Sequence, residues 1–225
     1  MTRSSTTVVS ALLGTVLACA ACASGAGTPS PPTGPAPAIS AEEYEDLYLA
    51  RLDSARMRFT DADVAFMTNM IHHHAQAIEM ADMVPERTRN PQIRTLAARI
   101  INAQNDEIAI MRRWLQDRDQ PVPPPAGDAD AHAAMGHTQH HEMQMPGMLT
   151  PEQLAELERS RGVEFDRLFL TSMIRHHQGA VTMVNELFAT DGAGQDEEVF
   201  KFANDAQVDQ GTEVARMQGM LQALP

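Results

Sequence analysis

Nine histidines are the residues of this chain best suited to chemistry, and all of them fall into three clusters that methionines accompany. The clusters occupy residues 72–74, 132–141 and 176–177. Histidine used only for packing or solubility would be scattered along the chain. Imidazole nitrogen together with thioether sulfur is a donor set that suits copper. The clustering therefore predicts a metal site, with copper as the metal.

The middle cluster lies in a stretch without hydrophobic periodicity, where eight of the seventeen residues from His132 to Met148 are His or Met. Thioether sulfur stays neutral and binds Cu(I) or Ag(I), imidazole adds affinity for Cu(II), and zinc gains little from methionine. A spacer that binds nothing is the alternative interpretation. The predicted ligands here are His132, Met135, His137, His140, His141, Met143, Met145 and Met148.

The other two clusters belong to an internal repeat. Residues 66–80 align with residues 169–183, so that FMTNMIHHH matches FLTSMIRHH. After a three-residue insertion, residues 104–115 align with residues 210–221. Apolar residues recur every three or four positions in each segment, which predicts amphipathic helices. Two copies of a helical hairpin predict an antiparallel four-helix bundle, an all-α fold.

Within each repeat, two adjacent histidines lie on the apolar face of the first long helix. A glutamate lies on the apolar stripe of the second, which is costly unless the carboxylate is paired or bound. Either these groups hold a metal, or each His–Glu pair is a buried hydrogen-bond network that sets the bundle register. The predicted bundle ligands are Met70, His73, His74, Met80, Glu107, Met111, Met173, His176, His177, Met183, Glu213 and Met217.

Capping and turn residues place the ends of the helices. Capping boxes at Ser40 and Thr150 predict a short helix in front of each repeat. Thr60 or Asp61 starts the first long helix, and no stretch alternates with the period of a strand. The breaks between long helices are predicted from Pro85 to Asn90 and at residues 191–194.

The N-terminus predicts export. Arg3 is the only charged residue among the first forty, and the apolar run that follows it ends in small residues. That run is shorter than the roughly 20 residues that span a bilayer. Residues 16–19 resemble a bacterial lipobox with Cys19 as the lipidated residue, Cys22 being the alternative frame and plain secretory cleavage the alternative process. The predicted organisation is a signal peptide (1–22), a flexible tether (23–39), a first repeat (40–118), a linker (119–149) and a second repeat (150–225).

Composition narrows the functional classes. The net charge of −13 argues against nucleic acid as a partner, since phosphate recognition needs a basic surface. Both cysteines precede the predicted folded part, which argues against cysteine-based zinc or redox chemistry there. The chain contains no Glu-x-x-His motif, which makes a di-iron or manganese oxidase a poor fit. A cuprous oxidase and a non-metal envelope interaction module stay open as alternatives.

Residues 70–74 and 173–177 resemble the Met-Ile-x-His-His signature of the bacterial family called domain of unknown function 305. Residues 104–111 resemble its Gln-x-x-Glu-Ile pattern, which a Met follows. The spacing from the Ile to the Met is one residue shorter here than in the family, and Val214 replaces the Ile in the second repeat. The resemblance covers nearly all of residues 41–224.

The resemblance implies a ferritin-like fold and, for some members, an exported copper-binding protein linked to copper resistance. We therefore expect an envelope lipoprotein on the outer face of the cytoplasmic membrane that sequesters, buffers or hands on copper. Cu(I) is the preferred ion, with Ag(I) as its mimic, and no protein partner is indicated.

Overall fold

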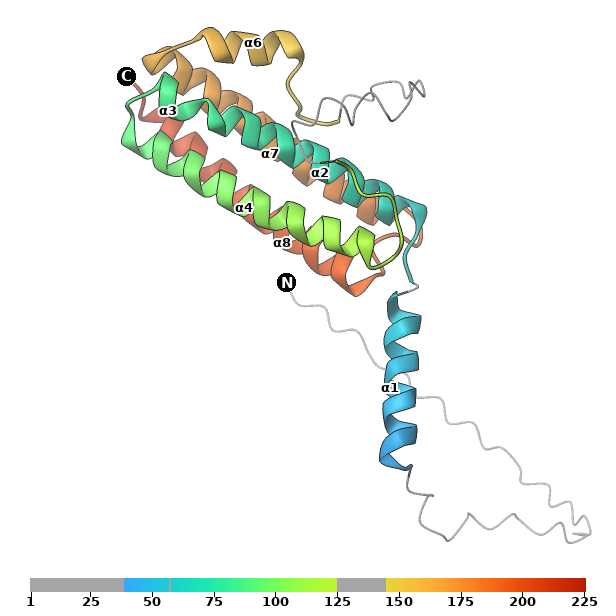
Figure 1. Cartoon of the computed structure of the whole chain (residues 1–225). Helices are drawn as coiled ribbons and strands as arrows, with labels where there is room; N and C mark the ends of the chain where they lie inside the picture. Colours follow the sequence, from blue (N-terminus) through green and yellow to red (C-terminus); the bar gives the residue numbers. More distant parts are fainter. Residues whose placement is uncertain (1–38, 57, 125–144) are drawn as a thin grey trace, which may run out of the picture. The chain divides into compact units, whose positions relative to one another are not determined.

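Four long helices arise from the two copies of the repeat, as predicted. The computed structural model describes residues 39–56, 58–124 and 145–225. The long helices lie side by side (Figure 1), and no strand occurs in the described part of the chain. They are α2 (Asp61–Asp82), α4 (Pro91–Gln116), α7 (Gly162–Ala189) and α8 (Glu197–Gln222).

Three shorter helices accompany them. A helix precedes each repeat, as the capping residues predict: α1 (Ala41–Arg56) and α6 (Pro151–Arg159). The expectation that Pro85 ends the first long helix was wrong, because α2 already ends at Asp82. Pro85 instead lies in the first turn of the short helix α3 (Val84–Arg87), where a missing N–H costs nothing.

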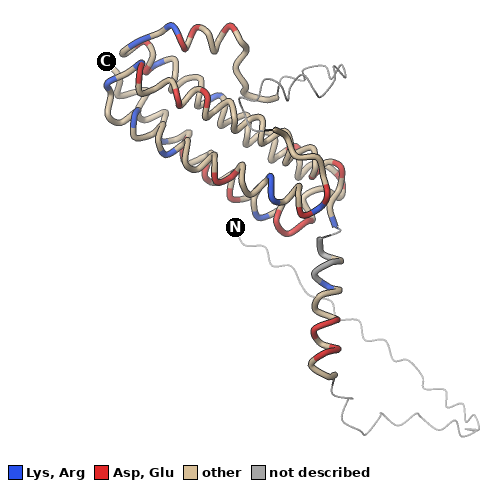
Figure 2. Tube along the Cα trace, in the orientation of Figure 1, with Lys and Arg blue, Asp and Glu red and all other residues tan. Residues whose placement is uncertain are grey.

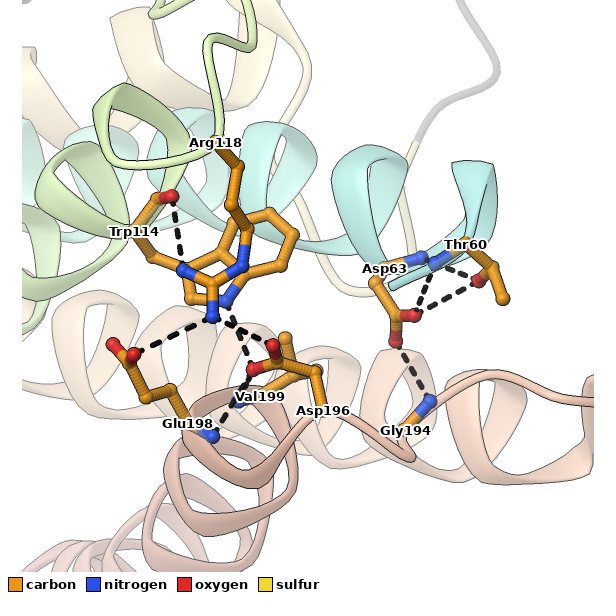
Figure 3. Close-up of polar contacts among 8 residues, drawn as sticks. All are labelled: Thr60, Asp63, Trp114, Arg118, Gly194, Asp196, Glu198 and Val199. Carbon is orange, nitrogen blue, oxygen red and sulfur yellow. Dashed lines mark hydrogen bonds and ion pairs between the residues drawn. The ribbon is translucent and has the colours of Figure 1, made fainter. Parts of the chain in front are cut away.

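Capping boxes start two of the helices. The Thr60 hydroxyl accepts a hydrogen bond from the Asp63 amide, and the Asp63 carboxylate accepts one from the Thr60 amide at 2.8 Å. The other oxygen of Asp63 accepts the Gly194 amide at 2.7 Å, so this cap also fastens the turn between α7 and α8 (Figure 3). Thr150 and Gln153 form the equivalent box at the start of α6.

A buried ion pair joins the end of α4 to the start of α8. The carboxylate of Asp196 caps α8 and accepts hydrogen bonds from Trp114 Nε1 at 3.0 Å and Arg118 Nη2 at 2.6 Å. The Arg118 guanidinium also lies over the Trp114 ring, 4.5 Å from its centroid, and contacts Glu198 (Figure 3). A counter-ion at hydrogen-bond distance is what makes the Arg118 charge tolerable inside the core.

The apolar core forms two clusters, one toward each end of the bundle. The first joins Phe66 near the start of α2 to Leu187 near the end of α7, and the second joins Met80 near the end of α2 to Phe165 near the start of α7. These contacts show that α2 and α7 run antiparallel. The histidines of both helices lie between the two clusters in the sequence of each helix.

Lys and Arg positions are interspersed with Asp and Glu positions along α4, α7 and α8, whereas α2 has Asp and Glu but no Lys or Arg (Figure 2). Among the described helices, none combines the length and the apolar character that a membrane span requires. The interior of the bundle is therefore the more informative place to look for a site.

Candidate metal centre

A polar layer lies between the two apolar clusters. Consecutive positions on a helix are about 100° apart, so two adjacent histidines can share one broad inward face. His73 and His74 on α2 are both fully buried, and so are His176 and His177 on α7, at no more than 1% exposure. None of the four belongs to either apolar cluster. The inward placement predicted for these histidines is what the structure has.

The outer histidine of each pair, His74 on α2 and His177 on α7, forms a hydrogen bond to a glutamate of its own repeat. His74 Nε2 lies 2.5 Å from Glu107 Oε2, and His177 Nε2 lies 2.7 Å from Glu213 Oε2. The glutamate side chains are 18% and 24% exposed, so each carboxylate bridges between the buried ring and the edge of the core. The predicted His–Glu pairing is therefore present in both repeats.

The inner histidines, His73 and His176, face each other across the seam between α2 and α7. Their ring centroids are 3.8 Å apart with the ring planes 36° from parallel. Burial lowers the pKa of His73 to about 4, with the charges of His74 and His177 adding to the effect, while a hydrogen bond to the Pro146 carbonyl opposes it. Burial also lowers the pKa of His176 well below its usual range, followed by the charge of His73. Both rings are thus neutral at pH 7.

Each of the four imidazoles has one nitrogen without a hydrogen-bond partner among the described residues. These nitrogens are Nδ1 of His73, His74 and His177 and Nε2 of His176. A ring nitrogen that faces a carbonyl or carboxylate oxygen carries the proton, because such an oxygen only accepts. For His73, whose ring is neutral, the unpartnered Nδ1 is therefore the nitrogen with the lone pair. This is the form of histidine that binds a metal.

An oxygen-rich cavity opens beside the outer pairs. It lies between α4 and α8, has a volume of about 260 Å³, and is lined in part by Glu107, Glu213, Gln104 and Gln210. Both glutamines are buried, and their Oε1 atoms have no partner in the described structure. Burial and then the charge of Glu107 raise the pKa of Asp209, which also lines the cavity. The two His–Glu pairs thus meet an opening that is lined by three carboxyl groups and by the guanidinium groups of Arg99 and Arg216.

The predicted methionine ligands of the bundle are buried on both sides of the polar layer. Three lie in the first apolar cluster and three in the second, all at most 7% exposed. The first three are Met70, Met111 and Met183, and the second three are Met80, Met173 and Met217. Within the described ranges, no group of three or more His, Cys, Asp or Glu side chains is placed to hold a metal.

Most of the predicted linker ligands cannot be placed. Met145 and Met148 are described, both half-buried, and Met145 packs against the first apolar cluster. The lipidation candidates Cys19 and Cys22 are outside the described part as well. The linker ligands that lie outside the described residues are His132, Met135, His137, His140, His141 and Met143.

The structure places two further residues beside the candidate site, Pro146 and Gln76, which were not predicted from the sequence. The carbonyl of Pro146 accepts a hydrogen bond from His73 Nε2 at 2.9 Å, and Gln76 fixes the backbone of Leu149. One signal was present in the sequence. The register of the repeat pairs Gln76 with Gly179, a non-conservative difference close to the matched histidines.

The fold and the donor set together define a helical bundle with a buried His and Met layer, and comparison with known proteins assigns the family. The model of the family "Domain of unknown function (DUF305)" matches residues 63–221. The chain belongs to this family, which confirms the resemblance found in the sequence. The expected ferritin-like four-helix fold is confirmed by the structures of its relatives.

Three relatives of known structure are informative. A DUF305 fragment from Deinococcus radiodurans is 31% identical, with 74% of this chain and 99% of that chain covered and a TM-score of 0.60. A DUF305 protein from Streptomyces coelicolor, provisionally described as secreted, is 28% identical, with 72% and 93% covered and a TM-score of 0.58. The Cu(I)-bound form of CopM is 31% identical, with 72% and 96% covered and a TM-score of 0.51.

CopM has also been solved with Cu(II), with silver and without metal. An uncharacterized protein of Acanthamoeba polyphaga mimivirus is 39% identical over 56 residues, which are 25% of this chain and 37% of that protein. This chain therefore spans well under half of that curated relative.

Proposed function

We propose that this protein binds copper in the polar layer of its bundle, Cu(I) ahead of Cu(II), and that it sequesters, buffers or transfers the ion. One observation carries the proposal: four buried imidazoles each keep a nitrogen without a partner, between two clusters that supply methionine. A buried polar atom left unpaired costs free energy unless something binds it. Neutral imidazole and thioether together favour copper over harder ions.

The ligands in this proposal come from both repeats. His73, His74, His176 and His177 contribute nitrogen, and the six methionines of the flanking clusters that the sequence predicts as ligands contribute sulfur. Glu107 and Glu213 take part through their hydrogen bonds to the outer histidines. Such bonds hold a ligating ring in orientation and raise its basicity. The known copper and silver complexes of CopM support the choice of metal.

Two further parts of the proposal concern residues outside the described ranges. We propose that the His and Met residues of the linker form a second site that captures the metal first. We also propose that the chain is exported and anchored by lipid at Cys19, or at Cys22, on the outer face of the cytoplasmic membrane. Fractionation of Cys19→Ala and Cys22→Ala variants tests this, because losing the modified cysteine should move the protein out of the membrane fraction.

The central test is competition of residues 23–225 for Cu(I) against a chromophoric chelator, with Ag(I), Zn(II) and Fe(II) run alongside. We expect tight uptake of Cu(I) and Ag(I) and weak binding of zinc and iron. The double variant His73→Ala with His176→Ala should weaken the bundle site, whereas deletion of residues 125–144 should spare it. His72→Ala is the matched control, because His72 lies on the same helix outside the two buried pairs.

The results distinguish the alternatives. An equal loss of Cu(I) from the double variant and from the linker deletion would contradict two separate sites. No uptake of Cu(I) at all would favour a non-metal interaction module of the cell envelope. Oxygen consumption by the Cu(I)-loaded protein, followed with an oxygen electrode, would indicate a cuprous oxidase instead of a protein that only binds.

A further inference from the structure

The segment Met145–Leu149, which we call the strap, crosses the seam between α2 and α7 beside the inner histidines. On the α2 side, Gln76 forms two hydrogen bonds with the backbone of Leu149. Its Nε2 donates to the Leu149 carbonyl at 3.0 Å, and its Oε1 accepts a hydrogen bond from the Leu149 amide at 2.7 Å. Both partners are buried. Fixing both polar groups of one peptide residue sets the position and direction of the strap.

On the α7 side, the strap touches the helix backbone itself. Gly147 has a φ of +80°, and a Cβ added at Gly179 would lie 1.9 Å from the Pro146 carbonyl oxygen. Any side chain at position 179 would therefore displace the strap. Arg175 Nη2 adds a hydrogen bond to the Met148 carbonyl at 3.2 Å. The strap is thus held by α2 and α7 together.

The strap meets the bundle at two positions where the repeats differ. In the register of the repeat, Gln76 corresponds to Gly179, and His72 corresponds to Arg175. Gln76, Gly179 and Arg175 all contact the strap. A single strap crossing a two-fold repeated bundle meets each repeat differently. The residues at these positions have consequently diverged, although the histidines beside them are the same.

The strap also decides which nitrogen of His73 is available. The Pro146 carbonyl only accepts hydrogen bonds, so the ring nitrogen that it contacts, Nε2, is protonated. The lone pair of the neutral ring is then on Nδ1, which has no partner among the described residues. Metal-binding histidines usually donate their other N–H to a carboxylate or a backbone carbonyl. The outer histidines have a carboxylate in that place, and His73 has the strap.

We propose that Gln76 and Gly179 are positioning residues: they hold the Pro146 carbonyl against His73 Nε2, so that His73 offers Nδ1 to a soft monovalent metal ion. The assignment of the nitrogen stands on the structure alone. Only the binding of metal at that nitrogen rests on the proposed function.

The test is Gly179→Ala with Gly211→Ala as its control. Both substitutions add one methyl group to a long helix, but the Cβ at position 211 meets nothing within 4 Å. The ring nitrogens of ¹⁵N-labelled protein are observed by NMR, and His73→Gln assigns the signals of His73. His177, which Glu213 holds through the same nitrogen, is the internal reference for an intact bundle.

We expect His73 of the unaltered protein to be protonated on Nε2, and Gly179→Ala to yield a mixture of both tautomers while His177 stays unchanged. Affinity for Cu(I) or Ag(I) should fall roughly 10- to 100-fold, the usual effect of losing such an outer partner. Gly211→Ala should change neither signal nor affinity. If Gly179→Ala does not fold, Gln76→Leu removes the two bonds to Leu149 without adding an atom at the crossing.

Two results would overturn the proposal. One is a His73 ring protonated on Nδ1 in the unaltered protein. The other is a tautomer mixture in Gly179→Ala with no loss of metal affinity beyond that of Gly211→Ala. If the tautomers behave as expected but the unaltered protein binds neither Cu(I) nor Ag(I), the proposed function fails, and the metal-binding half of this inference fails with it.

Discussion

The protonation of a buried histidine is set by what touches each ring nitrogen. His74 and His177 have carboxylates on Nε2, and His73 has a backbone carbonyl there. For His73, the carbonyl fixes the position of the ring proton, while burial lowers the pKa of the ring and keeps it neutral. A neutral, oriented imidazole in a core is poised to bind a soft cation.

The lowered pKa values predict a stability that falls with acidification. Below the unfolded pKa near 6.5, the unfolded chain takes up protons that the folded protein does not, so the free energy of unfolding declines as the pH drops from 6.5 toward 4. For His73 alone the loss reaches about 3 kcal/mol at pH 4, since each pKa unit is worth about 1.4 kcal/mol. Above pH 6.5 this contribution is fully present. Urea unfolding at several pH values measures it.

The comparison that isolates this effect uses two single variants. His73→Gln should flatten the decline between pH 6.5 and 4, because the titrating ring is gone. His72→Gln, on the same helix, should keep the decline of the unaltered protein. Equal pH dependence in both variants would show that carboxylates, and not the inner histidine, govern acid unfolding.

At the scale of the elements, two buried aspartates tie the hairpins together. Asp63 belongs to the capping box of α2 and accepts a hydrogen bond from the Gly194 amide of the other repeat. Asp196 caps α8 and accepts hydrogen bonds from Trp114 in α4 and from Arg118, which follows the end of α4. Each carboxylate thus starts one helix and fastens another segment to it. Both contacts hold the same end of the bundle, where α2 and α8 begin and α4 and α7 end.

Removing the carboxylate of Asp196 should be strongly destabilising. Asp196→Ala leaves Arg118 buried at 3% side-chain exposure without its main counter-ion, and the cost of breaking such a pair is roughly 3–5 kcal/mol. Asp191→Ala, in the exposed part of the same turn, should cost far less. Thermal and urea unfolding compare the two variants. Similar losses from both would mean that the ion pair contributes little to the stability of the fold.

At the scale of the whole molecule, duplication produces the candidate site. The antiparallel packing of α2 and α7 brings the histidine pair of one repeat to the level of the pair in the other, with an apolar cluster on either side. Neither repeat alone could form the contact between His73 and His176. The site is therefore a property of the assembled bundle.

The bundle should be stable without the residues before Phe59. A chain that starts at Phe59 keeps the ring contact with Trp114, at 5.6 Å between centroids, and the Thr60–Asp63 capping box. We expect its melting temperature to match that of residues 23–225. A chain that starts at Val64 loses both features, and the cap alone is worth roughly 0.5–2 kcal/mol. Lower stability of the chain from Phe59 would instead assign a stabilising role to α1.

Sequence alone determined the elements and the residue types of the candidate site. Helical periodicity and the two capping boxes depend on residues within a few positions of each other, so they can be predicted from the sequence. The alignment of the two repeats then showed that both contain an inward histidine pair. The glutamates on the apolar stripes of the second helices indicated the hydrogen-bond partners of these histidines. The bonds His74–Glu107 and His177–Glu213 follow from this local pattern. The boundary at Pro85 was misread because proline suits the first turn of a helix as well as its end.

Only the tertiary structure decided how the inner histidines are arranged. The close ring contact of His73 with His176 and the hydrogen bond of His73 to Pro146 join residues far apart in the chain. Gln76 and Gly179 are an unremarkable pair of differences until the strap is seen to pass between them. Periodicity reports which face of a helix is buried, but not which segment covers it. The nitrogen that each ring leaves free therefore depends on packing between distant segments.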